Sequence, residues 1–387
     1  MRINKLKIEG VGGIKFLDLS FNNRMNLLCG PNGVGKTTIL ESIAHIFSLG
    51  DTDILKRNVA SIGSKISVEI DNEGKVENKE IQFDTFIPEK KASISGLYRM
   101  CNQIISLKIT RTFQYQSLQS VSKDSSKEDG TLWKDARNGI SLTDVKNWFV
   151  NRYLYSPHHG ALSEAQLKNF ELAKKCFSLL NEDFTFSRVN ASSNEIMINT
   201  PSGEIYYEYL SSGFKSIISI LFGIIKEIEY RFKENQIIAE EFQGVILIDE
   251  IELHLHPEWQ EKIVEVLLNA FPKAQFFAST HSPHVIQAAK LNQIIALGFD
   301  AGNVIQRELP NSDFGFQGWT IEEVLNDVMG MSNLRTKIFN ELISRFDKAI
   351  EDENYENAEG IYKQIDGLLH PENTLRKLLK FQLAGLR

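Results

Sequence analysis

Cysteine is scarce in this sequence of 387 residues, which contains only Cys29, Cys101 and Cys176. An odd number of scattered cysteines argues against a disulfide framework and indicates reduced thiols in the core of an intracellular protein. No apolar run is long enough to cross a bilayer, and the charged N-terminus has no signal-peptide core. We therefore expect a cytoplasmic protein with no membrane partner.

Positive charge is not in excess either. Lysine and arginine number 43 against 50 aspartates and glutamates, which gives a net charge of −7. The surface as a whole therefore does not favour nucleic acid. A local basic groove stays open as an alternative to solvated faces, with Lys56, Arg57, Lys65, Lys90 and Lys91 as contributors. The length leaves room for two or three domain-sized units around a large core.

The octapeptide at 30–37, GPNGVGKT, fits the phosphate-loop pattern G-x-x-x-x-G-K-[ST]. We expect a buried strand over 25–29 before it and a helix over 38–47 after it, whose N-terminus faces the phosphates. The glycines let backbone N–H groups turn toward phosphate oxygens. The lysine would reach the β- and γ-phosphates, and the threonine hydroxyl would complete Mg²⁺ coordination. The expected nucleotide-binding residues are Asn32, Gly33, Gly35, Lys36, Thr37 and Thr38.

A second motif, at 245–250, is a run of four apolar β-formers that ends in Asp249 and Glu250. A buried strand of this kind delivers its carboxylates to the edge where α/β sheets bind ligands. Asp249 is expected to hold Mg²⁺ through water, and Glu250 to orient and deprotonate the attacking water. Such a strand alone is often structural, but after a phosphate loop it indicates nucleotide hydrolysis.

Two further polar segments complete the order of motifs. The segment at 210–216, LSSGFKS, opens an apolar helix expected over 216–226. The Ser211 hydroxyl and the amides of Ser212 and Gly213 could bind an anion there, although a plain serine N-cap would also explain the pattern. The strand that begins at 276 ends in a polar turn, where His281 could contact the γ-phosphate or be a capped loop residue.

Taken in this order, the four motifs resemble those of the ABC-type ATPases. The run at 249–257, DEIELHLHP, is similar to that of the soluble branch related to RecF, SMC and Rad50. Transporter subunits usually have Ser-Ala-Leu-Asp there instead. Within this branch, the sequence resembles stand-alone AAA-family ATPases of bacterial anti-phage systems, including the ATPase subunits of Septu and Septu-like retron systems.

The resemblance implies ATP and Mg²⁺ as cofactors, bound by a homodimer or a higher homo-oligomer. The signature residues Ser211, Ser212 and Gly213 would close over ATP held by another subunit, and His281 would join Glu250 in catalysis. The resemblance also implies a separate HNH-type nuclease as effector, with DNA or a retron ribonucleoprotein as a further candidate partner. No nuclease domain is expected in this chain, because a Toprim domain needs a longer α/β segment with its own acidic strand ends.

The expected function is therefore that of an ATP-hydrolysing regulatory subunit, which controls a separate nuclease in an anti-phage complex. A RecF-like ATPase that clamps DNA for repair or recombination is the alternative. A non-enzymatic scaffold is a third class, and it is disfavoured because Lys36, Asp249 and Glu250 are all present.

Two details depart from the pattern of the relatives. Many of them have a Phe-Arg pair near the first strand turn, whereas this sequence has VGGI at 11–14. Gln114 and Gln116, after a strand expected over 104–113, are the candidates for the Q-loop glutamine, although either could be a strand-edge residue. The histidine pairs at 254/256 and 281/284 could gather a metal, but the resemblance places them at the nucleotide site and the dimer face.

The expected fold is α/β: a P-loop ABC-type ATPase head with an N-terminal β meander, a helical insert and a C-terminal helical appendage. The expected domains are an ATPase lobe at 1–115 with the phosphate loop, a mainly helical insert at 116–203, a second ATPase lobe at 204–317, and the appendage at 318–387. The appendage opens with a capping box, Thr320 with Glu323. It either packs on the core or docks the effector.

Overall fold

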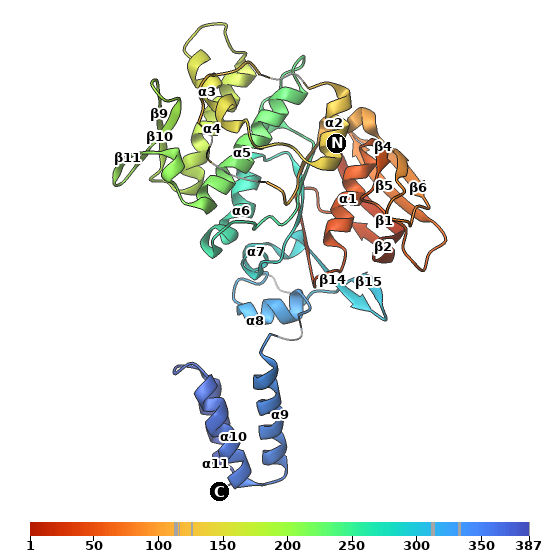
Figure 1. Ribbon diagram of the computed structural model, residues 1–387, viewed down its shortest axis with the longest axis vertical. Coiled ribbons are helices and arrows are strands. Elements are labelled where there is room, and N and C mark those ends of the chain that lie inside the picture. The colour runs from red at the N-terminus through yellow and green to blue at the C-terminus, as the bar shows by residue number, and fades with distance from the viewer. Residues whose placement is uncertain (112–114, 116, 125–126, 311–313, 332–333, 387) are drawn as a thin grey trace. The chain divides into compact units, whose positions relative to one another are not determined.

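The computed structural model describes residues 1–111, 115, 117–124, 127–310, 314–331 and 334–386 (Figure 1). The chain divides into two compact units, Met1–Gly330 and Met331–Arg387. Gln114 and Gln116, the Q-loop candidates, lie outside the described residues.

A six-stranded sheet forms the centre of the first unit. Five of its strands run parallel, and the sixth pairs antiparallel at one edge. In spatial order they are β15 (Asn303–Gln306), β14 (Ile294–Asp300), β3 (Met25–Cys29), β13 (Gln275–Ser279), β12 (Val245–Ile248) and β8 (Ile104–Leu107). The central strands are continuous apolar runs because both faces of the sheet are covered. Along β12, for example, Val245 and Leu247 enter one core, whereas Ile246 and Ile248 enter the other.

One of these two cores contains α1 (Lys36–Ile46) and an antiparallel sheet of four strands (Figure 1). Its strands, in spatial order, are β2 (Ile14–Ser20), β1 (Arg2–Val11), β5 (Ser64–Asn72) and β6 (Lys75–Phe83). The last two strands form a hairpin, with Glu73 and Gly74 at positive φ in its turn. A small sheet of β4 (Leu49–Thr52) and β7 (Ala92–Ser95) follows, and α2 (Asp129–Asn138) packs against α1 and β8.

The other core is mainly helical. It gathers side chains from α3 (Val145–Tyr155), α4 (Glu164–Leu180), α5 (Ser212–Arg231), α6 (Pro257–Ala270) and α7 (Pro283–Ala288). The small sheet of β9 (Thr185–Asn190), β10 (Glu195–Thr200) and β11 (Gly203–Tyr206) packs there as well, and α8 (Ile321–Glu323) continues into a π-helical turn, Val324–Val328. Figure 1 shows α3, α4 and α5 on one side of the unit and α1 with β1 and β2 on the other.

The expected domain limits differ from the break that the structure shows after Gly330. The insert expected at 116–203 is not separate, because Trp148 and Phe177 lie in the same core as Ile246 of the central sheet. The capping box of α8, expected to open the appendage, packs with α7 in the first unit.

Two expected elements also have other limits. The strand expected over 104–113 ends at Leu107, whose carbonyl accepts the Asp249 N–H, and the chain then turns at 108–110. The helix expected from 216 begins at Ser212, because Ser211 supplies the N-cap.

The second unit consists of α9 (Lys337–Glu351), α10 (Tyr355–Leu368) and α11 (Leu375–Ala384), so the helical character expected of the appendage is present. Their shared core contains Phe339, Phe346, Ile361 and Leu379. It is separate from the two cores of the first unit.

Three compositional expectations can be compared with the structure. All three cysteines are buried and free, and burial raises the pKa of the Cys29 thiol to about 12. No helix of the described residues combines the length and apolar character that crossing a membrane requires. Of the lysines considered for a basic groove, Lys56 donates to the Pro88 carbonyl at 3.1 Å and Lys65 pairs with Glu80 at 2.5 Å.

Candidate nucleotide-hydrolysis site

The phosphate loop connects β3 to α1, as expected from the sequence. Gly30, Gly33 and Gly35 have φ values of 138°, 77° and 103°, which other residues rarely adopt. A Cβ on Gly30 would clash with the Leu297 carbonyl, so that position requires glycine. Asn32 and Gly33 are exposed, and no atom lies within 4 Å of the point that a Gly33 Cβ would occupy. The loop therefore has an open, backbone-lined outer side that phosphate oxygens could approach.

Lys36 is buried against this loop. Its Nζ donates to the carbonyl oxygens of Gly30, at 2.8 Å, and Pro31, at 3.0 Å. Burial lowers the pKa of the ammonium group, while the carboxylates of Glu252, Asp249 and Glu250 act in the opposite direction. The charge that would meet a triphosphate is thus held in place beside the acidic end of β12.

The first turn of α1 also contacts the turn between β1 and β2. A Cβ on Gly12 would lie 3.5 Å from the Thr38 side chain, and a Cβ on Gly35 would lie 3.0 Å from Ile14. The VGGI turn therefore packs closely on the beginning of α1.

Thr37 and Asp249 meet at the carboxyl edge of the sheet. The Thr37 Oγ1 and Asp249 Oδ1 atoms are 3.3 Å apart, although 212 positions separate the residues in sequence. Thr37 is exposed, and Asp249 is nearly buried. A hydroxyl beside a carboxylate is a suitable donor set for Mg²⁺, which prefers oxygen ligands and completes its shell with water and phosphate. These two residues therefore fit the metal that the sequence implies.

Glu250 directly follows Asp249, beyond the end of β12, and is half-buried. Its φ of 48° places a non-glycine residue in the left-handed region. Its N–H donates to Ser279 Oγ at 2.7 Å, and the same hydroxyl donates to Asp249 Oδ1. Ser279 is the last residue of the neighbouring strand, β13, so its hydroxyl fixes both acidic residues to that strand.

His281 follows β13 at the same edge and is exposed. Its backbone N–H donates to Glu252 Oε1 at 2.6 Å. Glu252 Oε2 is buried without a hydrogen-bond partner among the described residues. The edge thus brings the segment after β12 into contact with the segment after β13.

The signature residues lie at the N-terminus of α5. Ser211 is the N-cap, and its Oγ accepts the Phe214 N–H at 3.3 Å. Ser212 is exposed, whereas Gly213 is buried. A Cβ on Gly213 would lie 3.1 Å from the Trp259 ring, so the start of α5 packs tightly on α6. The serine N-cap interpretation of this segment is therefore correct, and it leaves Ser212 accessible from outside.

Sequence reasoning gave no role to Arg111, Ser279 or Glu252. Arg111 donates to the main-chain carbonyls of Asp249, at 2.8 Å, and Glu250. Ser279 and Glu252 lie within two of the sequence motifs, so their position could have marked them as site residues. Arg111 has no such signal, since its partners are backbone atoms far along the chain.

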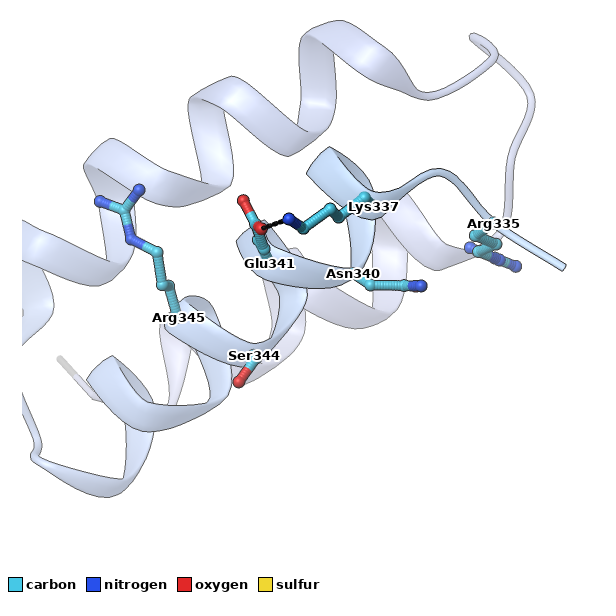
Figure 2. A pocket seen from close by; sticks show the side chains of 6 residues that line it. All are labelled: Arg335, Lys337, Asn340, Glu341, Ser344 and Arg345. Atoms are coloured by element: carbon cyan, nitrogen blue, oxygen red, sulfur yellow. Dashed lines mark ion pairs between the residues drawn. The ribbon is translucent and has the colours of Figure 1, made fainter. Parts of the chain in front are cut away.

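The second unit has a hollow of its own. It has a volume of about 770 Å³ and follows one face of α9. Figure 2 shows Lys337 and Glu341 pointing toward each other there, 3.7 Å apart, with Arg345 one turn further on. No cluster of three or more His, Cys, Asp or Glu side chains that could hold a metal is found in the described part of the chain.

Comparison with known proteins assigns the class first. Residues 25–287 match the family described as "AAA domain, putative AbiEii toxin, Type IV TA system", and the chain belongs to this family of ATPase domains. The match includes the phosphate loop, the signature, the Asp-Glu strand and His281. The class expected from the motifs is therefore confirmed.

The particular family follows from a second comparison. The Septu protein PtuA of Bacillus thuringiensis is 46% identical over 399 residues, which cover 99% of this chain and 98% of that protein. The chain belongs to the Septu PtuA family. The retron Vc95 probable ATPase of Vibrio cholerae is 42% identical over 93 residues, 24% of this chain and 18% of that protein.

Among solved structures, the SMC head domain from Thermotoga maritima is similar. It is matched over 80% of this chain and 100% of its own length, with 16% identity and a TM-score of 0.45. This likeness is weak and adds nothing to the family assignment.

Proposed function

We propose that this chain binds and hydrolyses ATP with Mg²⁺, and that it thereby controls a separate effector nuclease in an anti-phage defence complex. The observation that supports this proposal best is the 3.3 Å approach of Thr37 Oγ1 to Asp249 Oδ1, beside Lys36. A cation, a hydroxyl and a carboxylate at the edge of a parallel sheet are what Mg²⁺ and a triphosphate need.

Each residue has a separate task in this proposal. Lys36 exchanges its bonds to the loop carbonyls for the β- and γ-phosphates, while the loop N–H groups bind phosphate oxygens. Thr37 and Asp249 hold Mg²⁺, which when bound neutralises charge on the phosphates. Glu250 accepts the proton of the attacking water, and His281 contacts the γ-phosphate.

We further propose that the site is completed by a second copy of the chain. The exposed Ser212 and the N-terminus of α5 support this part of the proposal, because a helix N-terminus attracts anions. Ser212→Arg should block the signature without disturbing the buried Gly213. Mixing it with Lys36→Ala should restore activity in dimers that pair an intact loop with an intact signature. Full activity of Ser212→Arg alone as a monomer would contradict a shared site.

Membership of the Septu PtuA family supports the defence role, and the Septu and retron resemblance supports a separate HNH-type nuclease as effector. The second unit offers a surface for such a partner. On α11, Lys377 and Lys380 are exposed next to Leu378 and Phe381, which are 55% and 78% exposed.

Two variants test the proposal. Lys36→Ala should lose ATP binding, because it removes the only side-chain cation of the loop. Glu250→Gln should keep ATP binding and lose about 10²–10⁴ in turnover, the usual contribution of a positioned base. Lys168→Ala and Glu164→Gln, which change an exposed ion pair on α4, are matched controls and should behave like the parent.

Calorimetry, ATP turnover and the nuclease activity of a co-expressed effector are the measurements. Unchanged ATP affinity of Lys36→Ala, or parental turnover by Glu250→Gln, contradicts the assignment of the site. Effector activity that is identical with and without ATP contradicts the regulatory role. Strong, salt-dependent DNA binding by the isolated chain would favour the RecF-like alternative.

A further inference from the structure

The backbone at Glu250 is strained. Its φ of 48° is unusual for a residue with a Cβ and persists only where the surroundings enforce it. The residue lies beyond the end of β12, where the regular pairing between strands stops. Contacts other than regular strand pairing must therefore hold this residue in its conformation.

Ser279 holds one side of this step. Its Oγ accepts the Glu250 N–H and donates to Asp249 Oδ1. Its own backbone carbonyl accepts the Ile251 N–H at 3.0 Å. One residue of β13 thus fixes the chain before and after Glu250.

Arg111 holds the opposite side. Its Nη1 donates to the Asp249 carbonyl at 2.8 Å, and its Nη2 donates to the Glu250 carbonyl. A planar guanidinium is the side chain that can grip two successive carbonyl oxygens in a fixed geometry. A lysine ammonium group could replace the positive charge, but it lacks the planar pair of N–H donors that contacts both carbonyls.

Burying the charged guanidinium group of Arg111 costs more free energy than a purely structural hydrogen bond would justify. Its side chain is 6% exposed, and its Nε has no hydrogen-bond partner among the described residues. Burial lowers the pKa of the guanidinium to about 10, while Asp249, Glu252 and Glu250 favour the charged form. The group therefore stays charged at neutral pH, within the field of three carboxylates at the site.

We propose that Arg111 and Ser279 are positioning residues that hold Glu250 in its left-handed conformation, so that its carboxylate can take the proton of the attacking water. Neither residue contacts the reacting atoms. Arg111 acts through the main-chain carbonyls of Asp249 and Glu250. Ser279 acts through the Glu250 N–H. This inference rests on the proposed role of Glu250 as the base.

A positioning role and a merely structural one predict different kinetics. A 1 Å misplacement of a catalytic group can cost about 10²-fold in rate without weakening substrate binding. A structural role predicts that stability, ATP affinity and turnover fall together. The measurements that separate them are kcat, KM, ATP affinity and the unfolding temperature of the full chain.

Arg111→Lys and Arg111→Met are the main variants, and Ser279→Ala is a milder second one that removes only a hydroxyl. Arg137→Met is the control, because Arg137 also donates to a main-chain carbonyl, that of Asp51 at 2.7 Å, away from Glu250. We expect both Arg111 variants to lose about 10²-fold in kcat, with KM and ATP affinity near the parental values. Ser279→Ala should lose less, and the control should keep its kcat.

Each variant is also made in the Glu250→Gln background. If Arg111 acts through Glu250, its substitution adds no further loss there, because residues that act as a unit are not additive. Parental kcat in Arg111→Lys and Ser279→Ala, a parallel fall of kcat, affinity and stability, or an additive loss in the double variants would overturn the inference. Parental turnover by Glu250→Gln alone would instead refute the proposed base, so the two failures are distinguishable.

Discussion

The two units of this chain are stabilised by contacts of different range. In the first unit, neighbours in space come from distant parts of the sequence: Asn26 Nδ2 donates to the Phe276 carbonyl at 3.1 Å, and Gln275 bonds the backbone of Ile3. In the second unit, three consecutive helices share one small core, and an ion pair such as Arg376 with Asp366, at 2.6 Å, joins successive helices. The site geometry therefore depends on the whole of the first unit, whereas the second unit depends on local contacts.

Buried ion pairs are a second example of long-range contacts in the first unit. The first unit buries Glu227, which pairs with Arg231 and with Lys127, and Glu229, which pairs with Arg152. Lys127 comes from the segment that leads into α2. A buried charge is tolerated only when it is paired, so this segment is tied to α5.

The largest effect should come from the core of the second unit. Phe346 is fully buried there, and Phe346→Ala should cost about 3–5 kcal/mol, which is comparable with the total stability of so small a domain. We expect residues 331–387 to lose protection in hydrogen exchange while ATP turnover by the first unit persists. Phe381→Ala, at a residue of the same unit that is 78% exposed, is the control and should change little. Loss of ATP turnover in Phe346→Ala alone would show that the units are not independent.

His45 should make the stability of the first unit depend on pH near neutrality. His45 is buried, with Nδ1 bonded to the Glu41 carbonyl and Nε2 to Thr52 Oγ1, and burial lowers its pKa from 6.5 to about 3. Between these values the unfolded chain binds a proton that the folded chain does not, so stability falls as pH falls below 6.5. From pH 7 to pH 5 this linkage costs about 2 kcal/mol.

Urea unfolding of the parent and of His45→Gln at both pH values measures this linkage. The glutamine can keep hydrogen bonds but does not titrate, so its loss between pH 7 and pH 5 should be smaller by that amount. An equal loss in both proteins would mean that His45 does not titrate as its burial implies.

The phosphate loop and the Asp-Glu strand could be predicted from sequence, because each is a short pattern whose chemistry lies in its own residues. The role of Arg111 could not be predicted, because it contacts main-chain carbonyls 138 and 139 positions away. Every residue has such a carbonyl, so the sequence does not show which one a side chain contacts. The packing of the helices at 145–180 could not be predicted for a related reason. The apolar faces of α3 and α4 predict burial but do not say which core they enter, and in the structure they contribute to the core that also contains Ile246 of the central sheet.

The smallest expected effect concerns a threonine N-cap that occurs in both units. Thr336 Oγ1 accepts the Phe339 N–H at the start of α9, and Thr320 Oγ1 accepts the Glu323 N–H at the start of α8. Replacing either threonine by alanine should cost about 1 kcal/mol. Because a small domain has a small unfolding entropy, Thr336→Ala should lower the Tm of the second unit by about 4–8 °C. The same loss in the much larger first unit should move its Tm by about 2 °C or less. Thr336→Ser and Thr320→Ser keep the capping hydroxyl and should restore most of each loss, as followed by scanning calorimetry. Equal shifts in both units would mean that the chain unfolds as one cooperative body.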